Sequence, residues 1–190
     1  MIYTGRFWTR SNEESRNMKT LDIGCGKNKT KGATGIDRLP GSDADVIHDL
    51  NRFPYPFEDN AFDLVIGRNV LEHLDDVVGV MTEIHRICKP GARVEILVPH
   101  FSSVDAFTDI THKHFFSSHS FDYFVENMEY SFYTGKARFL VLKKQIRFGL
   151  RGKVLPFLGT FARLSPDIYE KGFSFIFPAQ TVEFILRADK

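Results

Sequence analysis

The stretch Thr20-Leu21-Asp22-Ile23-Gly24-Cys25-Gly26 carries the strongest pattern in this chain of 190 residues. A short apolar run that stops at glycine is typical of a buried strand followed by a tight turn. Glycine has no Cβ, so backbone N–H groups in such a turn can approach a ligand closely. In an open α/β sheet, ligands bind in the crevice beyond the carboxyl ends of the strands. The stretch therefore predicts a strand over residues 19–23 and a ligand-binding loop after it.

The glycine loop does not match the dinucleotide-binding fingerprint. That fingerprint requires G-x-G-x-x-G, whereas Lys29 stands at the position of the third glycine. Asp22 precedes Gly24 in a place where the fingerprint requires no acid. A carboxylate there can orient the loop and favours a cationic ligand, so we expect a ligand other than a dinucleotide.

Further short apolar runs follow, each bounded by Gly, Pro, Asn or Asp, and they predict strands at residues 33–37, 45–50, 62–69 and 93–99. Residues 69–89 have the apolar spacing of a helix, and Pro90-Gly91 is a stop signal after it. Strands this apolar, in this order, indicate a mostly parallel sheet in an α/β fold.

The second half of the chain differs in composition from the first. It begins with a His- and Phe-rich loop (101–119), and the pattern then predicts a helix at 120–128 and a strand at 137–146. A basic insertion (147–163) and a last strand (181–188) complete it, and the last two strands suit an antiparallel edge. We expect residues 1–18 to be a lead-in and 19–190 to be one domain, with a ligand-binding half (19–100) and a cap half (101–190).

The connections in the first half are unusually short. Only residues 27–32 lie between the glycine loop and the second strand, and only 38–44 between the second and third strands. A parallel crossover normally needs a dozen or more residues. The first helices of the fold are therefore expected to be shortened to turns.

Seven short motifs follow one another in the first half: Asp22-Ile23-Gly24-Cys25-Gly26, Gly35-Ile36-Asp37, His48-Asp49-Leu50-Asn51, Phe53-Pro54-Tyr55-Pro56-Phe57, Phe62-Asp63-Leu64-Val65, Asn69-Val70-Leu71-Glu72-His73-Leu74 and Ile87-Cys88-Lys89-Pro90-Gly91. In this order they resemble the class I S-adenosylmethionine-dependent methyltransferases, particularly the small type 11 group. The resemblance covers roughly residues 19–100 and implies a Rossmann-like methyltransferase fold that binds S-adenosyl-L-methionine.

The resemblance also implies roles for particular residues. Gly24 and Gly26 would pass under the methionine and ribose of the cofactor, and Asp37 would accept hydrogen bonds from the ribose hydroxyls. Asp49 would bind the adenine amino group, and carboxylates suit both tasks because they only accept hydrogen bonds. The remaining predicted cofactor-binding residues are Asp22, Cys25, Arg38, Leu50 beside the adenine ring, and Asn69 near the methionine portion.

The catalytic group is harder to predict, because methyl transfer from a sulfonium depends largely on positioning. His73, His100 and His114 are the candidates for catalytic or acceptor contacts. Each also has a structural interpretation, as a packed or hydrogen-bonded loop histidine. The alternate histidines of Thr111-His112-Lys113-His114 could ligate a metal, but no Cys or close carboxylate pair completes a site, so we predict no metal.

Charge is segregated along the chain. Residues 136–163 contain eight Lys or Arg and no acid, which leaves 17 basic and 24 acidic residues elsewhere. The segment Lys143 to Arg163 could lie on an anionic membrane, bind nucleic acid, or pack as a cap whose cations pair with the acidic remainder. No run of about 18 apolar residues could span a membrane, and no secretion signal is evident. With two cysteines, Cys25 and Cys88, in unrelated settings, we expect no disulfide and a cytoplasmic location.

These observations favour methyl transfer from S-adenosylmethionine to a small-molecule or lipid-like acceptor, by a monomer or homodimer. A non-catalytic S-adenosylmethionine-binding sensor or assembly module is the alternative. Methylation of RNA or protein rests on the basic segment alone. Amino-group methylation of nucleic acid is disfavoured because Gly67-Arg68-Asn69-Val70 stands where an Asn-Pro-Pro-Tyr type of strand end would be needed.

Overall fold

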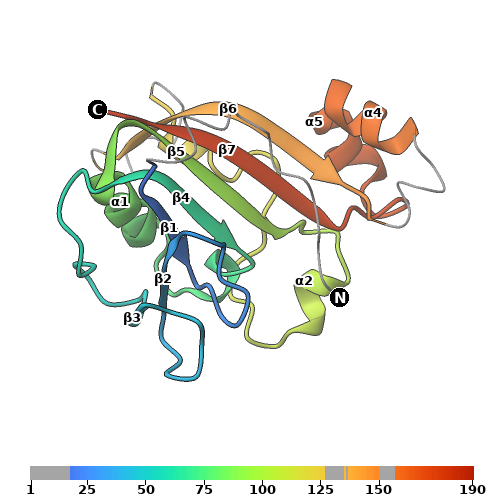
Figure 1. The fold of residues 1–190 in the computed structure, drawn as a ribbon. Coiled ribbons are helices and arrows are strands. Elements are labelled where there is room, and N and C mark those ends of the chain that lie inside the picture. Colours follow the sequence, from blue (N-terminus) through green and yellow to red (C-terminus); the bar gives the residue numbers. More distant parts are fainter. Residues whose placement is uncertain (1–17, 127–134, 136, 150–156) are drawn as a thin grey trace.

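The computed structural model describes residues 18–126, 135, 137–149 and 157–190. Seven strands form one sheet in the order β3-β2-β1-β4-β5-β7-β6. The strands are β1 (Thr20–Ile23), β2 (Thr34–Asp37), β3 (Val46–Ile47), β4 (Phe62–Arg68), β5 (Cys88–Pro99), β6 (Arg138–Arg147) and β7 (Thr181–Asp189). Figure 1 shows them side by side across the molecule.

The first five strands are parallel, as the apolar runs predicted. Strand β1 lies in the middle of this part, paired on one side with β2 and on the other with β4. Strand β2 also pairs with β3, and β4 with β5, all in the same direction. The carboxyl ends of β1, β2 and β4 consequently meet at one edge of the sheet.

The last two strands complete the sheet in antiparallel fashion, which confirms the predicted fold class. Strand β7 enters between β5 and β6 and pairs antiparallel with both. It is therefore an interior strand, and β6 forms the edge. Its apolar residues Val182, Phe184 and Leu186 alternate along the strand, so they share the face of the sheet that packs into the core, and all three are fully buried.

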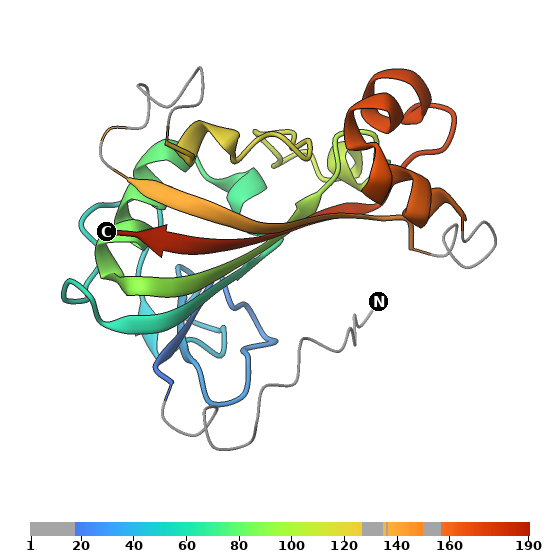
Figure 2. The same ribbon diagram turned by 90° about the horizontal axis from the view of Figure 1, so that it is seen from above.

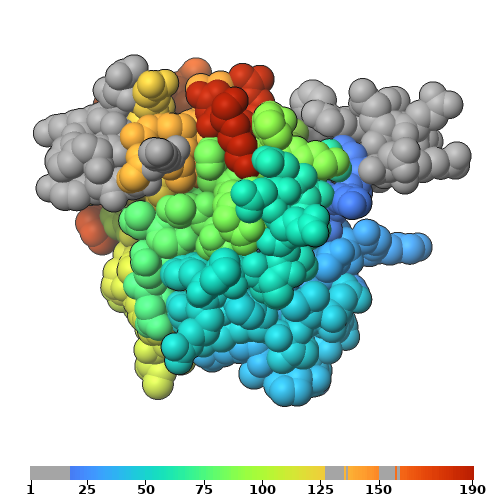
Figure 3. All heavy atoms as spheres, turned by 90° about the vertical axis from the view of Figure 1, so that its left-hand side faces the viewer, coloured from blue at the N-terminus to red at the C-terminus, as the bar shows by residue number. Residues whose placement is uncertain are grey.

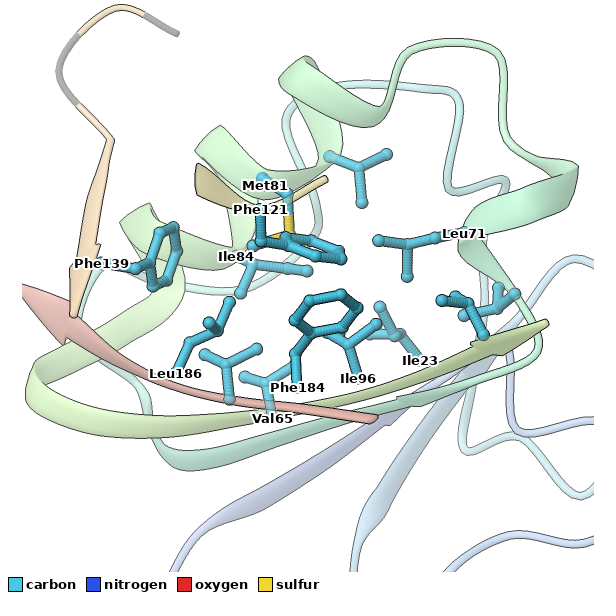
Figure 4. Close-up of a cluster of buried hydrophobic side chains, with 14 of the residues drawn as sticks. Ile23, Val65, Leu71, Met81, Ile84, Ile96, Phe121, Phe139, Phe184 and Leu186 are labelled. Atoms are coloured by element: carbon cyan, nitrogen blue, oxygen red, sulfur yellow. The ribbon is translucent and has the colours of Figure 1, made fainter. Parts of the chain in front are cut away.

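The core lies between the sheet and helix α1 (Val77–Ile87), as Figure 4 shows. Met81 and Ile84 of α1 point down onto Ile23, Val65 and Ile96 of three neighbouring strands, and all five are buried. Aromatic side chains from the second half enter the same cluster, namely Phe121, Phe139 and Phe184. One continuous core thus joins the two halves of the chain.

Hydrogen-bonded turns replace the early helices, as the short connections predicted; no helix occurs in the described residues 24–61. The buried carboxylate of Asp22 accepts bonds from the Thr30 N–H and hydroxyl, both at 2.7 Å, and pairs with Arg68 at 2.9 Å. Asp45 pairs with Lys29 at 2.8 Å and accepts the Gly35 N–H at 2.7 Å. The carboxylates of Asp22 and Asp45 therefore hold these short turns in place, where a longer connection would form a helix.

The predicted helix over residues 69–89 is wrong in its first part. Asn69 has a positive φ of 49°, a 3₁₀ turn η2 (Leu71–His73) follows, and α1 begins only after Asp76. The Asp76 side chain accepts the Gly79 N–H at 2.8 Å and so caps the helix. The helix also ends early, at Ile87, because Cys88 is extended and begins β5, which was expected to start at residue 93.

Two other predicted elements are shorter than expected. The strand expected at 45–50 consists of β3 alone, and the helix expected at 120–128 is a 3₁₀ turn η3 (Asp122–Phe124), with 127 and 128 outside the described residues. The loop expected at 101–119 contains a short helix, α2 (Asp105–Thr108). After β6 come α4 (Phe157–Leu164), α5 (Pro166–Ile168) and the π-helical turn η5 (Tyr169–Phe173), which gather at one end of β6 and β7 (Figures 1 and 2).

The described cations of the basic segment are largely paired. Arg147 and Lys143 approach Glu183 at 2.6 and 3.3 Å, and Lys144 approaches Asp122 at 2.5 Å. Lys136, Arg151 and Lys153 and the lead-in 1–17 lie outside the described residues. Cys25 and Cys88 are both free and buried. No helix in the described part of the chain has the length and apolar character needed to cross a bilayer.

Candidate active site

A pocket opens where the carboxyl ends of β1, β2 and β4 meet. Its cavity measures about 240 Å³, near the lower end of the roughly 300–1,000 Å³ typical of small-molecule pockets. The wall consists of Gly24, Asp37, Arg38, Leu39, Asp49, Leu50, Asn51, Asn69, Val70, His73, Leu74 and Thr111. The sheet topology thus brings together residues that lie far apart in the sequence.

The glycine loop and the end of β2 are locked to each other. One oxygen of the Asp37 carboxylate accepts the Gly26 N–H at 2.9 Å, and the other accepts the Leu39 N–H at 2.9 Å. Gly24 N–H donates to the Ile36 carbonyl at 2.8 Å. Two backbone donors therefore hold the Asp37 carboxylate in a fixed orientation at the pocket wall.

Hydrogen bonds hold the segment after β3 against helix α1. Figure 3 shows both on one face of the molecule. Arg86 of α1 donates to the Tyr55 and Phe57 carbonyls at 3.1 and 2.9 Å and pairs with Glu83 at 2.8 Å. The Tyr55 hydroxyl in turn donates to the Leu50 carbonyl at 3.0 Å. Arg86 and Tyr55 accordingly position the part of the pocket that Leu50 contributes.

Asn69 lies at the end of β4, where the chain turns sharply. Its φ of 49° belongs to the left-handed region, and its N–H donates to the Leu97 carbonyl of the neighbouring strand at 2.8 Å. Asparagine tolerates this conformation better than most residues. The turn sends Val70 back toward Gly24, and both line the pocket.

Of the predicted cofactor-binding residues, Gly24, Asp37, Arg38, Asp49, Leu50 and Asn69 line the pocket. Asp22, Cys25 and Gly26 lie behind this wall: Asp22 bonds to Thr30 and Arg68, and Gly26 bonds to Asp37. Burial, together with the nearby charges of Asp22 and Asp37, raises the pKa of the Cys25 thiol. These three residues shape the loop rather than the surface of the cavity.

The three histidine candidates are not brought together. His73 lines the pocket. His114 Nε2 donates to the Leu74 carbonyl at 2.9 Å, outside the wall. His100 is completely buried, with its ring nitrogens 2.8 Å from the Ser102 hydroxyl and 3.2 Å from Glu170, so its contacts are those of a structural residue.

Five further residues of the pocket wall were not predicted from the sequence, namely Leu39, Asn51, Val70, Leu74 and Thr111. Asn51 follows the predicted Asp49-Leu50 pair and could have been included with it. Thr111 comes from the loop after α2, where no periodicity indicates which side chain faces inward. The place of Thr111 in the wall depends on the tertiary path of this loop, which no local sequence pattern indicates.

Two ionisable groups beside the pocket have shifted pKa values. Burial raises the pKa of Glu72, the residue before His73, to about 7. Burial and the neighbouring His112 ring lower the pKa of His73 below its usual range. Two groups whose neutral forms are favoured by burial are therefore adjacent in η2, and of the two only His73 lines the pocket.

Comparison with known proteins agrees with this geometry. Residues 21–96 match the family model described as a methyltransferase domain. The chain is 48% identical over 42 residues to an uncharacterized protein, YafE, of Escherichia coli, and 47% identical over 47 residues to the demethylmenaquinone methyltransferase of Lactiplantibacillus plantarum. These segments are 22% and 25% of this chain and span only 20% of the length of each relative.

Solved structures match over a longer part of the chain. The S-adenosylmethionine-dependent methyltransferase of Mesorhizobium loti superimposes with a TM-score of 0.57 at 13% identity, covering 90% of both chains. A methyltransferase of Archaeoglobus fulgidus gives a TM-score of 0.57 at 16% identity, covering 90% of this chain and 86% of that one. Residues 21–96 are therefore similar to a methyltransferase domain, and the chain has the Rossmann-like fold of the solved S-adenosylmethionine-dependent methyltransferases.

Proposed function

We propose that the chain transfers a methyl group from S-adenosylmethionine to a small-molecule acceptor with an apolar part. The observation that carries this proposal is the pocket at the carboxyl ends of β1, β2 and β4, lined by Asp37, Asp49 and Asn69. When bound, the cofactor supplies a methyl carbon attached to a cationic sulfur that leaves readily. In this proposal, residues 19–100 bind the cofactor and 101–190 contribute the acceptor side.

The pocket residues fit this cofactor chemically. The Asp37 carboxylate is already oriented by two N–H groups and retains lone pairs that suit ribose hydroxyls. Asp49 and the Leu50 backbone would hold the adenine, and Gly24 and Asn69 the methionine portion. The wall holds two carboxylates, Asp37 and Asp49, and one guanidinium, Arg38, so its formal charge favours a cationic ligand over an anionic one.

The chain's part in the reaction would be mainly positioning. A good leaving group needs an acceptor atom held in line with it more than a strong base. His73 is the predicted histidine at the pocket wall, with Nδ1 2.8 Å from the Thr111 hydroxyl. It would contact the acceptor, whereas His100 and His114 would support the loops around it.

The surroundings of Thr111 favour an apolar acceptor. Val104, Phe107 and Ile110, which precede Thr111 in the chain, are 72%, 63% and 96% exposed. Ile110 is adjacent in sequence to the pocket residue Thr111, so an apolar part of the acceptor could contact it. The ion pairs of Lys143, Lys144 and Arg147 support packing rather than membrane or nucleic-acid binding for that segment. The free cysteines fit a cytoplasmic location.

Calorimetry with S-adenosylmethionine and its demethylated product tests the proposal. Asp37→Ala should weaken binding by about 10- to 100-fold, since hydrogen bonds to a charged group contribute about 1.5–3 kcal/mol. Asp43→Ala, an exposed neighbour outside the pocket wall, is the matched control and should bind like the unaltered chain. Equal binding by both variants would contradict the proposal.

Mass spectrometry of the demethylated product, with panels of apolar hydroxyl, thiol and amine acceptors, tests the transfer itself. Turnover with any acceptor supports an enzyme. Tight cofactor binding without turnover across the panels would instead favour the sensor or assembly module.

A further inference from the structure

A second cluster of side chains at η2 shares His73 with the pocket wall. Glu72 and His73 belong to η2, and His112 comes from the loop after α2. One carboxylate oxygen of Glu72 and one ring nitrogen of each histidine lie within 4.8 Å of one another. The two segments are joined by the backbone, because Lys113 and His114 N–H both donate to the Glu72 carbonyl, at 2.7 and 3.3 Å.

Hydrogen bonds fix which nitrogen of each ring carries the proton. His112 Nδ1 lies 3.0 Å from the Ala106 carbonyl, which can only accept, so Nδ1 is protonated and Nε2 has the lone pair. The Thr111 hydroxyl donates to Asp109 at 2.7 Å and therefore accepts from His73 Nδ1 at 2.8 Å. In both rings Nε2 is thus the basic nitrogen, which is the state that a metal ligand requires.

The Glu72 side chain has no partner to explain its burial. It is 1% exposed, and neither carboxylate oxygen has a hydrogen-bond partner in the described part of the chain. A buried carboxylate without a partner is costly, and proteins compensate such groups with a counter-charge or a metal. No Lys or Arg among the described residues pairs with the Glu72 carboxylate, so a bound cation would supply the missing counter-charge.

We propose that Glu72, His73 and His112 bind one divalent transition-metal ion beside the pocket. Two imidazoles and one carboxylate form a ligand set typical of zinc and ferrous sites that keep a coordination position open. Bonds of about 2.0–2.2 Å place such ligand atoms roughly 3.3 Å apart, so binding would draw the three groups inward by at most about 1.5 Å. The Ala106 carbonyl, and Thr111 with Asp109, would serve as the outer hydrogen-bond partners of the two rings.

The site deepens the proposed function and rests on it for its role. Because His73 is both a proposed ligand and a pocket residue, the metal would lie next to the cavity in which the cofactor is proposed to bind. An acceptor hydroxyl bound there would have a lower pKa and would release its proton to water in the pocket. Its oxygen would then form a bond to the methyl carbon as the bond from that carbon to the cofactor sulfur breaks, and the neutral demethylated cofactor would leave. The metal would also fix the orientation of that oxygen toward the methyl group.

Metal titration of the full chain, stripped with a chelator and free of any affinity tag, tests the site without any cofactor. Calorimetry with Zn²⁺ should give one equivalent, and Co²⁺ should give the visible absorption of an ion with nitrogen and oxygen ligands. Glu72→Gln and His112→Ala should each weaken Zn²⁺ binding by at least about 10-fold. His119→Ala, a histidine bonded to Asp122 outside the cluster, is the control and should bind as the unaltered chain does.

Absence of stoichiometric Zn²⁺ and Co²⁺ binding to the unaltered chain would contradict the proposed site. So would a loss of Zn²⁺ affinity in His119→Ala as large as that in Glu72→Gln and His112→Ala. If a variant fails to fold, as circular dichroism would reveal, the Co²⁺ spectrum of the unaltered chain decides. Calorimetry with S-adenosylmethionine on the stripped chain separates the two proposals. Metal binding without cofactor binding would contradict the methyl-transfer proposal alone. Cofactor binding without metal binding would contradict the metal site alone.

Discussion

Two glycines in the first loop meet different requirements. Gly24 has a φ of 62°, and a Cβ built on it would lie 2.3 Å from Val70 Cγ2. Gly26 has a φ of 52°, but a Cβ there would meet no atom within 4 Å. Gly24 is thus required for conformation and for space, whereas Gly26 is required for conformation only.

Gly24→Ala should therefore push Val70 into the pocket and abolish measurable S-adenosylmethionine binding. Gly26→Ala should cost only about 1–2 kcal/mol of unfolding free energy, the usual penalty for a left-handed alanine, with binding largely retained. Urea unfolding and calorimetry on the two variants give both quantities. Equal loss of binding in the two would show that space at Gly24 is not the deciding factor.

The sequence predicted those pocket residues whose position follows from the end of a strand. Gly24, Asp37 and Asn69 each stand where a parallel strand stops, and such ends meet at one edge of the sheet. Thr111 could not be predicted, because its place depends on how a loop returns to η2. The tautomers of His73 and His112 depend on that same return, so the histidine pattern alone gave no metal site.

Among the elements, α1 illustrates why periodicity misplaces a boundary. The apolar spacing continues from Val70 through η2 into α1, so one helix satisfied the pattern. The break is local: a left-handed Asn69 begins the turn, and the Asp76 carboxylate begins a new helix. An aspartate followed by an apolar run was the available signal. Strands β1, β2 and β4, which end at glycine, aspartate or asparagine, were predicted to within one residue at each end.

Asp76→Ala should lower the unfolding free energy by about 1 kcal/mol, the usual loss when a helix cap is removed. Asp76→Asn should retain most of the stability, because asparagine can accept the same Gly79 N–H. Chemical unfolding of the three proteins measures the difference. A loss of the same size in Asp76→Asn would indicate that charge, rather than capping, is the contribution.

For the molecule as a whole, the contact between α1 and the segment after β3 should make stability depend on acid. Burial raises the pKa of Glu83, but hydrogen bonds from Arg86 and from the Tyr55 N–H outweigh it and leave that pKa below its ordinary 4.5. A carboxylate with a lowered folded pKa adds stability above the unfolded value, and this is lost as the pH falls through the folded pKa.

Glu83→Gln should accordingly reduce the melting temperature most above about pH 4.5 and progressively less below it. Thermal unfolding of both proteins from neutral to acidic pH gives the comparison. A difference that stays constant across this range would mean that ionisation of Glu83 does not stabilise the fold.

The interior place of β7 has a consequence for biosynthesis. Strand β6 is made before β7, yet its partner in the sheet is β7, and β5 likewise pairs with β7 on that side. Until residues 181–189 leave the ribosome, the edges of β5 and β6 that pair with β7 have unpaired backbone N–H and C=O groups. We expect nascent chains stopped before residue 181 to be held by chaperones or to associate through these edges, and chains that include β7 to be released.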